Sequence, residues 1–532
     1  MCIKTDKEIK NHSEIFEFLE IYKAYEEYKL KNKLMDFDDM LIYTLTALHR
    51  YPSLLDEFSE KAKYINVDEA QDTSLMQHKI IKLINQKYQN LFMVGDEDQS
   101  IYSFRGAFPK ALLNFKDEYQ NGSILKMEEN FRSKSEIINC ANNFIKQNKN
   151  RYDKKMVTSS KNKSKEKCVF AVKLDCQEMQ YAKISEIIHN SQKDKTIGIL
   201  YRNNHSAIAV CEYLDRHKIN FKIKEHKSFF STSSVIKDFI SFFELAIDRG
   251  DFKAFSSVLY KTSFKLKRSL IDAYDLDQLN CEDIFEVLYD RVFDDNQNIA
   301  KKVFCLQKLF EKLSRKKPFD AIDFILNDIG YIEYLRFKNS FKSYSYCLQK
   351  IAVLKNLIID CKNLKEALYK IDNIENIINA HSSNESNITL STAHSAKGLE
   401  FDIVILIDLF EGVFPSVSVI SSLNEKDSDE MEEEARLFYV GVTRAKEKLY
   451  LLSAEKSCGD FISVSRFINR LFESPKKSSL SIGAKVEHFI FGKGSVTKIL
   501  EEENCIKVFF GSNGERKLSL EIMGTKKLRL ID

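Results

Sequence analysis

The sequence predicts a multidomain α/β protein with parallel sheets, a long all-helical segment and a small C-terminal β-barrel. Three observations predict this fold class. Short apolar runs end in acidic or polar residues, which is typical of buried parallel strands. Between about residues 235 and 385 these runs give way to amphipathic helical stretches. Near the C-terminus, short alternating segments are punctuated by glycines, the pattern of a small barrel; these are Gly483, Gly492, Gly494, Gly511 and Gly514.

Length and composition indicate an ordinary globular protein of several domains. A chain of 532 residues is too long for one hydrophobic core and predicts three or four domains. The hydrophobic share of 44% and the charged share of 30% exclude fibrous and largely disordered classes. The formal net charge is only +3, so any basic surface for nucleic acid must be local.

Cysteine usage and hydropathy predict a cytoplasmic protein. The 11 cysteines lie singly, with no CxxC pair and no zinc spacing, so neither a disulfide framework nor a cysteine metal site is expected. The N-terminus is polar from its first residues, and the most apolar run, 403–409, contains Asp408. Such a run is far too short to cross a bilayer, so we expect neither secretion nor membrane insertion.

The elements follow in chain order. Residues from about 14 to 60 carry apolar side chains at helical spacing and predict helices. With helical segments between them, six apolar runs predict two α/β layers on parallel sheets. The six runs are 64–67, 91–94, 168–172, 196–201, 401–407 and 448–452. The lysine-rich stretch 148–167 predicts a solvated loop, which we favour over a nucleic-acid patch.

Two adjacent carboxylates, Asp68 and Glu69, end the first of these runs. One can hold a Mg²⁺ ion while the other orients or deprotonates a water that attacks a γ-phosphate. An isolated pair is weak evidence, because acidic residues follow strands in many α/β proteins. The full string DEAQDTS, 68–74, resembles the Walker B motif of superfamily-1 DNA helicases of the UvrD/Rep/PcrA type. The resemblance implies Asp68 as the Mg²⁺ ligand and Glu69 as the catalytic base.

A second string, GDEDQSIYSFRGA at 95–107, joins a polar strand end to aromatic residues and an arginine. Here Gln99 can sense a phosphate, while Tyr102 and Phe104 offer stacking faces worth on the order of 1–3 kcal/mol per base. The two rings alone would favour core packing, but the whole string resembles helicase motif III. It implies DNA contacts by Tyr102, Phe104 and Arg105; Phe104 stands where many members carry Trp.

Two further strings resemble motifs IV and V. In NFRS, 130–133, the resemblance implies that Arg132 reaches the γ-phosphate and that Phe131 stacks on the adenine. In LSTAHSAKGLEFD, 390–402, it implies that Glu400 contacts the nucleotide. Four residues of that string inherit contacts with the DNA backbone: Thr392, His394, Lys397 and Gly398. A lone His394 would more often be a structural hydrogen-bonding residue, but its string favours the DNA role.

The string EEEARLFYVGVTRA, 432–445, resembles motif VI. The resemblance implies that Arg444 is an arginine finger and binds nucleotide. Such groups contribute about 10³ to 10⁵ in rate. The acidic run that opens the string is typical of a solvated helix face, and we expect this for Glu432. We expect Arg436 to serve a structural ion pair.

The resemblance covers nearly the whole chain from Asp36 to Leu471, because DFDDML at 36–41 also matches a family string. It implies a RecA-like P-loop NTPase fold and an ATP- and Mg²⁺-dependent 3′→5′ helicase acting on single-stranded and partly duplex DNA. The helical stretch corresponds to domain 2B. The string from Gly483 to Val496 resembles the Tudor-like (SH3-like) module of PcrA-type proteins, which implies RNA polymerase as a partner.

The resemblance also predicts the domain boundaries. We expect the C-terminal part of motor domain 1A, with Walker B and motif III, at 1–121. Motor domain 2A is expected at 122–246 and 387–473, interrupted by the helical 2B insertion at 247–386. A linker at 474–481 then leads to the barrel at 482–532.

One family string does not occur in the sequence. No phosphate-binding loop of the form G-x-x-x-x-G-K-[ST] is present. In such motors the backbone amides and the lysine of this loop hold the phosphates of ATP. We therefore expect only part of domain 1A here, with an uncovered sheet edge, and little ATPase activity from this polypeptide alone. Three explanations remain open: an incomplete start of the sequence, a split gene whose second chain supplies the loop, and a decayed remnant. The rival function is a non-enzymatic module that binds DNA and RNA polymerase.

Overall fold

The computed structural model of the protein forms two compact units, Met1–Phe472 and Glu473–Asp532. It describes residues 18–119, 121–159, 166–224, 230–273, 281–381, 385–421, 428–457, 460–472, 482–488, 491–500, 505–511, 514–519 and 528–530. Among the described helices, none is long and apolar enough to cross a membrane.

The N-terminal part of the first unit is built around a small parallel sheet. Strands β1 (Ile65–Val67) and β2 (Leu91–Met93) pair in parallel, with Ile65 opposite Leu91. Both strands lie where the sequence predicts them. The helices of this part are α2 (Phe18–Asn32), α3 (Phe37–Arg50), α4 (Pro52–Lys61), α5 (Leu75–Asn85), α6 (Lys110–Leu113) and α7 (Phe115–Glu118), with the short 3₁₀ turns η1 (Ala70–Asp72), η2 (Glu97–Gln99) and η3 (Ser103–Arg105).

A larger sheet follows in the order β11-β10-β9-β6-β8-β7, and β5 also pairs with β10. Six of its strands are mutually parallel and β11 is antiparallel. This mixed α/β arrangement with a six-stranded parallel sheet fits the RecA-like fold. The strands are β5 (Val169–Cys176), β6 (Ile197–Tyr201), β7 (Lys222–Ile223), β8 (Ile388–Thr392), β9 (Phe401–Leu406), β10 (Ala445–Ser457) and β11 (Asp460–Phe461).

This sheet has a well-buried interior. Every residue of β6 and β8 is buried, because neighbouring strands flank them and helices cover the sheet. An aromatic cluster of Phe144, Phe414, Phe438 and Phe467 joins the helices on one side. The accompanying elements are α8 (Ser135–Ile145), α9 (Met179–His189), α10 (Asn204–Arg216), α20 (Val417–Ser421), α21 (Ser428–Val442), α22 (Arg466–Phe472) and the parallel strand pair β3 (Glu129–Asn130) and β4 (Val157–Thr158).

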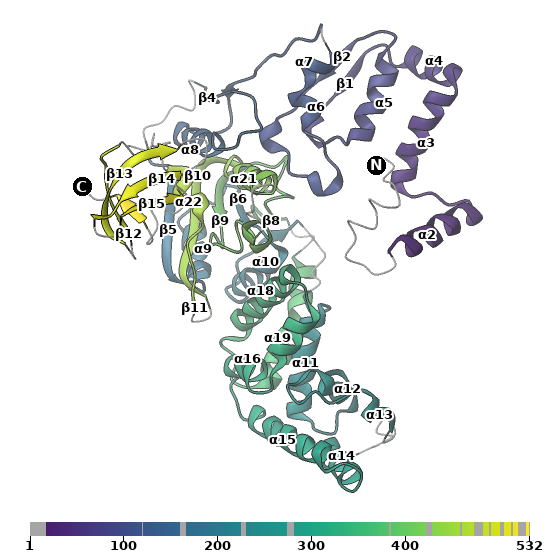
Figure 1. Ribbon diagram of the computed structural model, residues 1–532, viewed down its shortest axis with the longest axis vertical. Helices are drawn as coiled ribbons and strands as arrows, with labels where there is room; N and C mark the ends of the chain where they lie inside the picture. The colour runs from purple at the N-terminus through teal and green to yellow at the C-terminus, as the bar shows by residue number, and fades with distance from the viewer. Residues whose placement is uncertain are drawn as a thin grey trace. The chain divides into compact units, whose positions relative to one another are not determined.

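The described residues from 234 to 380 form helices joined by short loops and contain no strand, which confirms the sequence prediction there. Figure 1 shows it as the teal and green run of helices that separates β7 from β8 along the chain. The elements are α11 (Ser234–Ile247), α12 (Phe252–Val258), η5 (Leu259–Lys261), α13 (Ser269–Ala273), α14 (Ile284–Phe293), α15 (Gln297–Leu313), α16 (Pro318–Asn327), α17 (Tyr331–Lys338), α18 (Phe341–Ile358) and α19 (Leu364–Ala380).

The second unit contains an antiparallel sheet in the order β15-β14-β13-β12-β16. Its core is formed by Val486, Val496, Ile506, Val508 and Phe510. The closure of this sheet into a barrel remains a prediction, and the expected linker 474–481 lies outside the described residues. The strands are β12 (Lys485–His488), β13 (Gly492–Leu500), β14 (Cys505–Phe509), β15 (Glu515–Ser519) and β16 (Leu528–Leu530).

The lysine-rich stretch 148–167 is not simply the solvated loop that its composition predicts. Residues 160–165 lie outside the described part of the chain, but the preceding residues are docked. Asn148 and Ser159 are buried, and Val157 and Thr158 form β4. Arg151 is paired with Asp98, and its side chain is only 9% exposed. The prediction is wrong here because the positive charges meet buried carboxylates rather than water.

Candidate active site

The two carboxylates of the Walker B string lie where β1 ends. Glu69 takes a left-handed backbone conformation, with φ of 48°, and begins the turn η1. The Glu69 amide donates to Asp68 Oδ1 at 2.9 Å, and Gln71 Nε2 donates to Glu69 Oε2. The side chain of Glu69 is 61% exposed, so both carboxylates remain accessible to a ligand.

Motif III lies beside these carboxylates and connects them to Arg444. The Asp96 amide donates to Gln71 Oε1 at 3.0 Å, while Gln99 Nε2 donates to Asp96 Oδ2 at 2.7 Å. On its other side, Gln99 Oε1 accepts from Arg444 Nη2 at 3.2 Å. Gln99 and Arg444, which separate motifs predict as phosphate sensor and arginine finger, are therefore in direct contact.

Arg444 is held rigidly between α21 and β10. It is 2% exposed, and its Nε donates to the Val440 carbonyl at 3.0 Å. Nη1 donates to the Leu399 carbonyl at 3.2 Å. Burial, followed by the nearby Arg132, lowers the pKa of Arg444 to about 10. The guanidinium stays charged at neutral pH, as a phosphate-binding arginine must.

Arg132 and Glu400, predicted as nucleotide contacts from motifs IV and V, form an ion pair. Arg132 Nε lies 2.9 Å from Glu400 Oε2, and Lys446 Nζ lies 2.7 Å from the other oxygen. Lys446 and then Arg132 hold the pKa of Glu400 below its usual range. Phe131, next to Arg132 in the chain, is 69% exposed.

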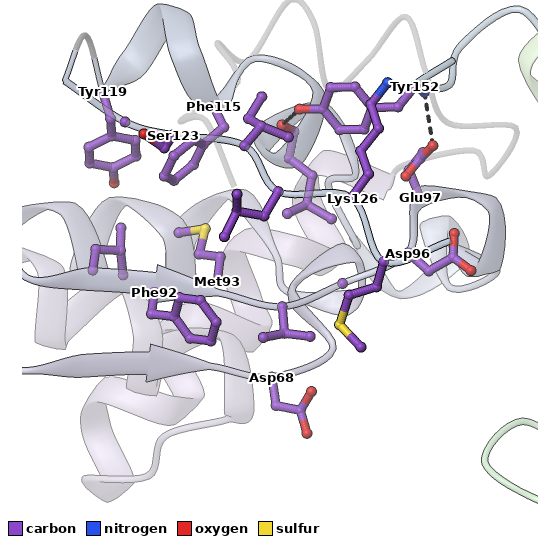
Figure 2. A pocket seen from close by; sticks show the side chains of 18 of the residues that line it. Asp68, Phe92, Met93, Asp96, Glu97, Phe115, Tyr119, Ser123, Lys126 and Tyr152 are labelled. Atoms are coloured by element: carbon purple, nitrogen blue, oxygen red, sulfur yellow. Dashed lines mark hydrogen bonds between the residues drawn. The ribbon is translucent and has the colours of Figure 1, made fainter. Parts of the chain in front are cut away.

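A cavity of about 1130 Å³ lies beside the Walker B carboxylates and motif III, and Arg132, Glu400 and Arg444 are not among the residues that line it. Its lining includes Asp68, Glu69, Gln99 and Tyr439. Figure 2 shows Asp68 at the end of its strand, across the cavity from Tyr152 and Glu97. Carboxylate oxygens are the ligands that Mg²⁺ prefers, and the cavity is large enough for a nucleotide. The carboxylates present are therefore chemically compatible with a Mg²⁺-nucleotide, which Asp68 would hold with Glu69 beside it.

A second cavity, of about 520 Å³, gathers the residues predicted to bind DNA except Lys397 and Gly398. Phe104 is 67% exposed, and its ring centroid lies 5.9 Å from that of His394. The Arg105 guanidinium lies 5.4 Å from the rings of both Tyr102 and Phe104. Thr392 forms part of the wall. Aromatic faces beside an arginine are suited to unpaired bases.

Burial, followed by the nearby Arg202 and Arg105, lowers the pKa of His394 to about 4. His394 is therefore neutral at physiological pH and offers a hydrogen bond or a stacking face rather than a positive charge. Positive charge in this cavity comes from Arg105 and from residues that the motifs did not indicate.

The cavity also contains Arg202, Asn203 and His205, where β6 meets α10, together with Tyr346 and Lys350 of α18. A sequence signal existed for the first group, because polar residues directly follow the buried run 196–201. No signal existed for Tyr346 and Lys350, since they lie in a helical stretch far from any motif. Their placement is set by packing between α18 and α10.

Lys397 lies on the nucleotide side of motif V. Its Nζ is 2.5 Å from Asp72 Oδ2 and 3.6 Å from Glu69 Oε2, and it donates to the Gln99 carbonyl at 3.0 Å. The side chain is only 9% exposed. Its predicted DNA contact therefore remains a prediction, and the contacts observed are with the Walker B string and motif III.

The acidic run of motif VI is not the solvated face predicted for Glu432. Glu432 is 7% exposed, and its carboxylate accepts from the Lys149 amide at 2.7 Å. It is buried because α21 packs against η2 and α8. The ion pair expected for Arg436 is present, at 3.7 Å from Glu432, and Arg436 Nε also donates to the Ser100 carbonyl at 2.9 Å.

Comparisons with known proteins agree with this geometry. The family described as "UvrD-like helicase C-terminal domain" matches residues 125–456, more than half of the chain. The family described as "UvrD/REP helicase N-terminal domain" matches residues 3–120. The chain belongs to the UvrD-like family of ATP-dependent DNA helicases.

Among its relatives are proteins named ATP-dependent DNA helicase PcrA. The one from Staphylococcus aureus is 28% identical over 566 residues, covering 95% of this chain and 76% of the relative. The one from Staphylococcus epidermidis is 28% identical over 553 residues, covering 94% of this chain and 75% of the relative. The helicase thus shares most of its length with these proteins, and DNA is its substrate.

Proposed function

We propose that this helicase moves along single-stranded DNA in the 3′→5′ direction and couples that movement to ATP hydrolysis through motif III. The observation that carries the proposal is the placement of one short segment. Gln99 contacts Arg444 at the nucleotide cavity, while Tyr102 and Phe104, a few residues later, line the aromatic cavity. A displacement of this segment would move residues in both cavities at once.

The roles follow from the contacts. Asp68 would hold Mg²⁺, which neutralises phosphate charge when bound. Glu69 orients and deprotonates the attacking water, and its accessible carboxylate supports this role. Gln99 and Arg132 sense the γ-phosphate, and Phe131 stacks on the adenine with Glu400 beside it. Arg444, preorganised by its three bonds to backbone and Gln99, stabilises charge on the transferring phosphoryl group.

In the aromatic cavity, Tyr102, Phe104 and His394 offer faces to bases, and Arg105 and Thr392 contact the strand. Lys397 and Gly398 belong to the same DNA track in this proposal. In this proposal the first unit comprises domains 1A, 2A and 2B, with the boundaries predicted from the motifs. Together these residues would let one base at a time occupy the cavity as the motor steps.

The phosphate-binding loop is supplied by residues outside these 532, in this proposal by an upstream segment or a separate chain. The proposal is supported by the missing G-x-x-x-x-G-K-[ST] string and by the exposed edge of the two-stranded sheet. Phe92 of β2 is 59% exposed, and Tyr64 beside β1 is 80% exposed. Reading the DNA upstream of Met1, and the neighbouring genes, for that string tests this point.

The completed motor provides the functional test. Adding the loop-bearing polypeptide should produce Mg²⁺-dependent ATP hydrolysis that oligo(dT) stimulates and that Glu69→Gln abolishes. A 3′→5′ motor displaces streptavidin from the 5′-biotinylated end of an oligonucleotide. Displacement from the 3′ end instead would contradict the direction, and hydrolysis unaffected by Glu69→Gln would contradict the assigned base.

A second candidate is a non-enzymatic module that binds DNA through the second motor half and RNA polymerase through the C-terminal unit. The observation that favours it is the missing loop string. If neither the upstream DNA nor a neighbouring gene encodes that string, the non-enzymatic function gains. Binding of RNA polymerase by the full chain, lost on removal of 482–532, would then identify its partner.

A further inference from the structure

Asp96 lies at the centre of the contacts that hold the candidate catalytic groups. Its amide donates to Gln71 Oε1 at 3.0 Å, and Gln71 in turn donates to the Glu69 carboxylate. Its Oδ2 accepts from Gln99 Nε2 at 2.7 Å, the side chain whose oxygen faces Arg444. The placement of Asp96 therefore affects both the candidate base and the candidate sensor.

A lysine from a distant part of the chain holds Asp96 in place. Lys154 precedes β4, and its Nζ lies 2.5 Å from Asp96 Oδ1, 2.8 Å from Glu97 Oε2 and 3.5 Å from Asp98 Oδ2. The side chains of Glu97 and Asp98 are only 3% and 2% exposed. Buried carboxylates require a paired charge, and Lys154 supplies one to all three.

Two neighbours of Lys154 complete this attachment. Arg151 forms a two-pronged pair with Asp98, with Nε at 3.0 Å from Oδ1 and Nη2 at 2.8 Å from Oδ2. The Tyr152 amide donates to Glu97 Oε1 at 2.9 Å, as Figure 2 shows. Arg151 thus supplies the countercharge of Asp98. Asp96 Oδ1 also accepts from the Asp98 amide at 3.1 Å, but among the described residues its ion pair is with Lys154.

The acidic cluster by itself resembles a cation site, because ligand oxygens of Asp96, Glu97 and Asp98 lie within 4.8 Å of one another. Lys154 already provides the positive charge at that place. Burial raises the pKa of Asp96, but the charge and hydrogen bond of Lys154, together with the hydrogen bonds from Gln99 and the Asp98 amide, outweigh burial and hold that pKa below its usual range. The three carboxylates are therefore grouped around the Lys154 ammonium.

We propose that Lys154 is a positioning residue for ATP hydrolysis: by fixing Asp96 it holds Gln71 against Glu69 and turns Gln99 towards Arg444. The proposal rests on the proposed function for the roles of Glu69 and Gln99. The mechanical link itself, from Lys154 through Asp96 to Gln71 and Gln99, does not depend on those roles. Without Lys154, the mutual repulsion of three close carboxylates would push Asp96 away from its present place.

Hydrogen exchange followed by mass spectrometry of the full chain tests this link. The variants are Lys154→Met, which removes the charge, Lys154→Arg, which keeps it, and Lys155→Met, a matched control with an exposed side chain. We expect Lys154→Met to accelerate exchange about tenfold in peptides covering 67–73 and 95–101, because bonds made through Asp96 loosen. Lys154→Arg should stay within about twofold of the natural chain, and Lys155→Met should have no effect.

The proposal is overturned if exchange at 67–73 stays at the natural level in Lys154→Met, whatever happens at 149–157. It is also overturned if Lys154→Arg exchanges as fast as Lys154→Met, or if Lys155→Met matches them. Circular dichroism confirms that each variant is folded. Because the exchange readout needs neither ATP nor DNA, a completed motor without ATPase activity would contradict the proposed function while leaving the link standing.

Discussion

The two motor regions of this helicase hold their functional groups in different ways. In 18–119 the sheet has two short strands, and neither contains a fully buried residue. In the other region six parallel strands surround β6 and β8, which are buried along their whole length. Arg444 accordingly is 2% exposed, whereas Glu69 is 61% exposed. The proposed finger Arg444 is fixed by a packed core, whereas the proposed base Glu69 is held by a few hydrogen bonds.

The largest expected effect is a difference between the two regions in the stability lost when an aromatic ring is removed. Phe438 lies fully buried among Phe144, Phe414 and Phe467, so Phe438→Ala should lower the free energy of unfolding by about 3–5 kcal/mol. Phe92→Ala removes an exposed ring and should change it by less than about 0.5 kcal/mol. Urea denaturation followed by circular dichroism measures both. Equal losses would contradict the difference between the regions.

A second prediction concerns the cavity that draws residues from both regions. Phe104→Ala should weaken binding to oligo(dT) by about 1–3 kcal/mol, roughly 5- to 150-fold, because one stacking face is lost. Phe337→Ala is the matched control, since Phe337 is 92% exposed and lies outside that cavity. Fluorescence anisotropy of a labelled oligonucleotide gives both affinities. Unchanged binding by the Phe104 variant would remove this cavity from the DNA track.

Each region also contains a carboxylate residue in a left-handed backbone conformation, with φ of 48° at Glu69 and 55° at Asp408. Glu69→Gly should change the free energy of unfolding by less than about 1 kcal/mol, because glycine adopts this conformation without strain while the amide of Gln71 loses its acceptor. Asp408→Gly should lower it by about 1–3 kcal/mol, because the amides of both Gln177 and Gln180 lose their acceptor in a fully packed core. Thermal unfolding of the two variants makes the comparison. A stabilised Asp408→Gly would contradict it.

The smallest expected effect is a pH dependence in the packed region. Burial raises the pKa of Asp408, and hydrogen bonds from Ser206, Gln177 and Gln180 only partly offset this. A carboxyl group whose pKa is raised on folding adds stability at acidic pH and loses it as pH rises through the folded value. The stability of Asp408→Asn relative to the natural chain should therefore increase from about pH 4 to pH 8. The midpoints of urea denaturation of both proteins across that range test this prediction. A stability difference that stays flat or falls as pH rises would contradict the raised pKa of Asp408.

The sequence predicted those parts of the fold whose local pattern matches their final environment. Aliphatic runs that end in polar residues became β6 and β9, because parallel strands buried on both faces need apolar side chains. Strand β8 was not predicted as a strand, since its buried residues include Thr389, Ser391 and Thr392. The Ser391 hydroxyl donates to the Thr392 carbonyl, and the Thr392 hydroxyl accepts from the Ser395 amide, contacts that no local pattern reveals.

The candidate site was predicted motif by motif, but the contacts between motifs were not. Gln99 and Arg444 were each indicated by the string around them, yet they are 345 residues apart. Lys154 lay within a lysine-rich stretch whose composition predicts exposure, and its carboxylate partners stand 58 and 57 residues earlier. Pairing over such separations depends on how the two motor regions meet, so only the folded chain reveals it.

The central claim is that these 532 residues contain the base, sensors and finger of a helicase motor but not its phosphate loop. ATP turnover by the purified chain, with Mg²⁺ and with and without oligo(dT), tests that claim most directly. The prediction is a rate no higher than that of Glu69→Gln under both conditions, while oligo(dT) still binds. Turnover that oligo(dT) stimulates and that Glu69→Gln abolishes would contradict it.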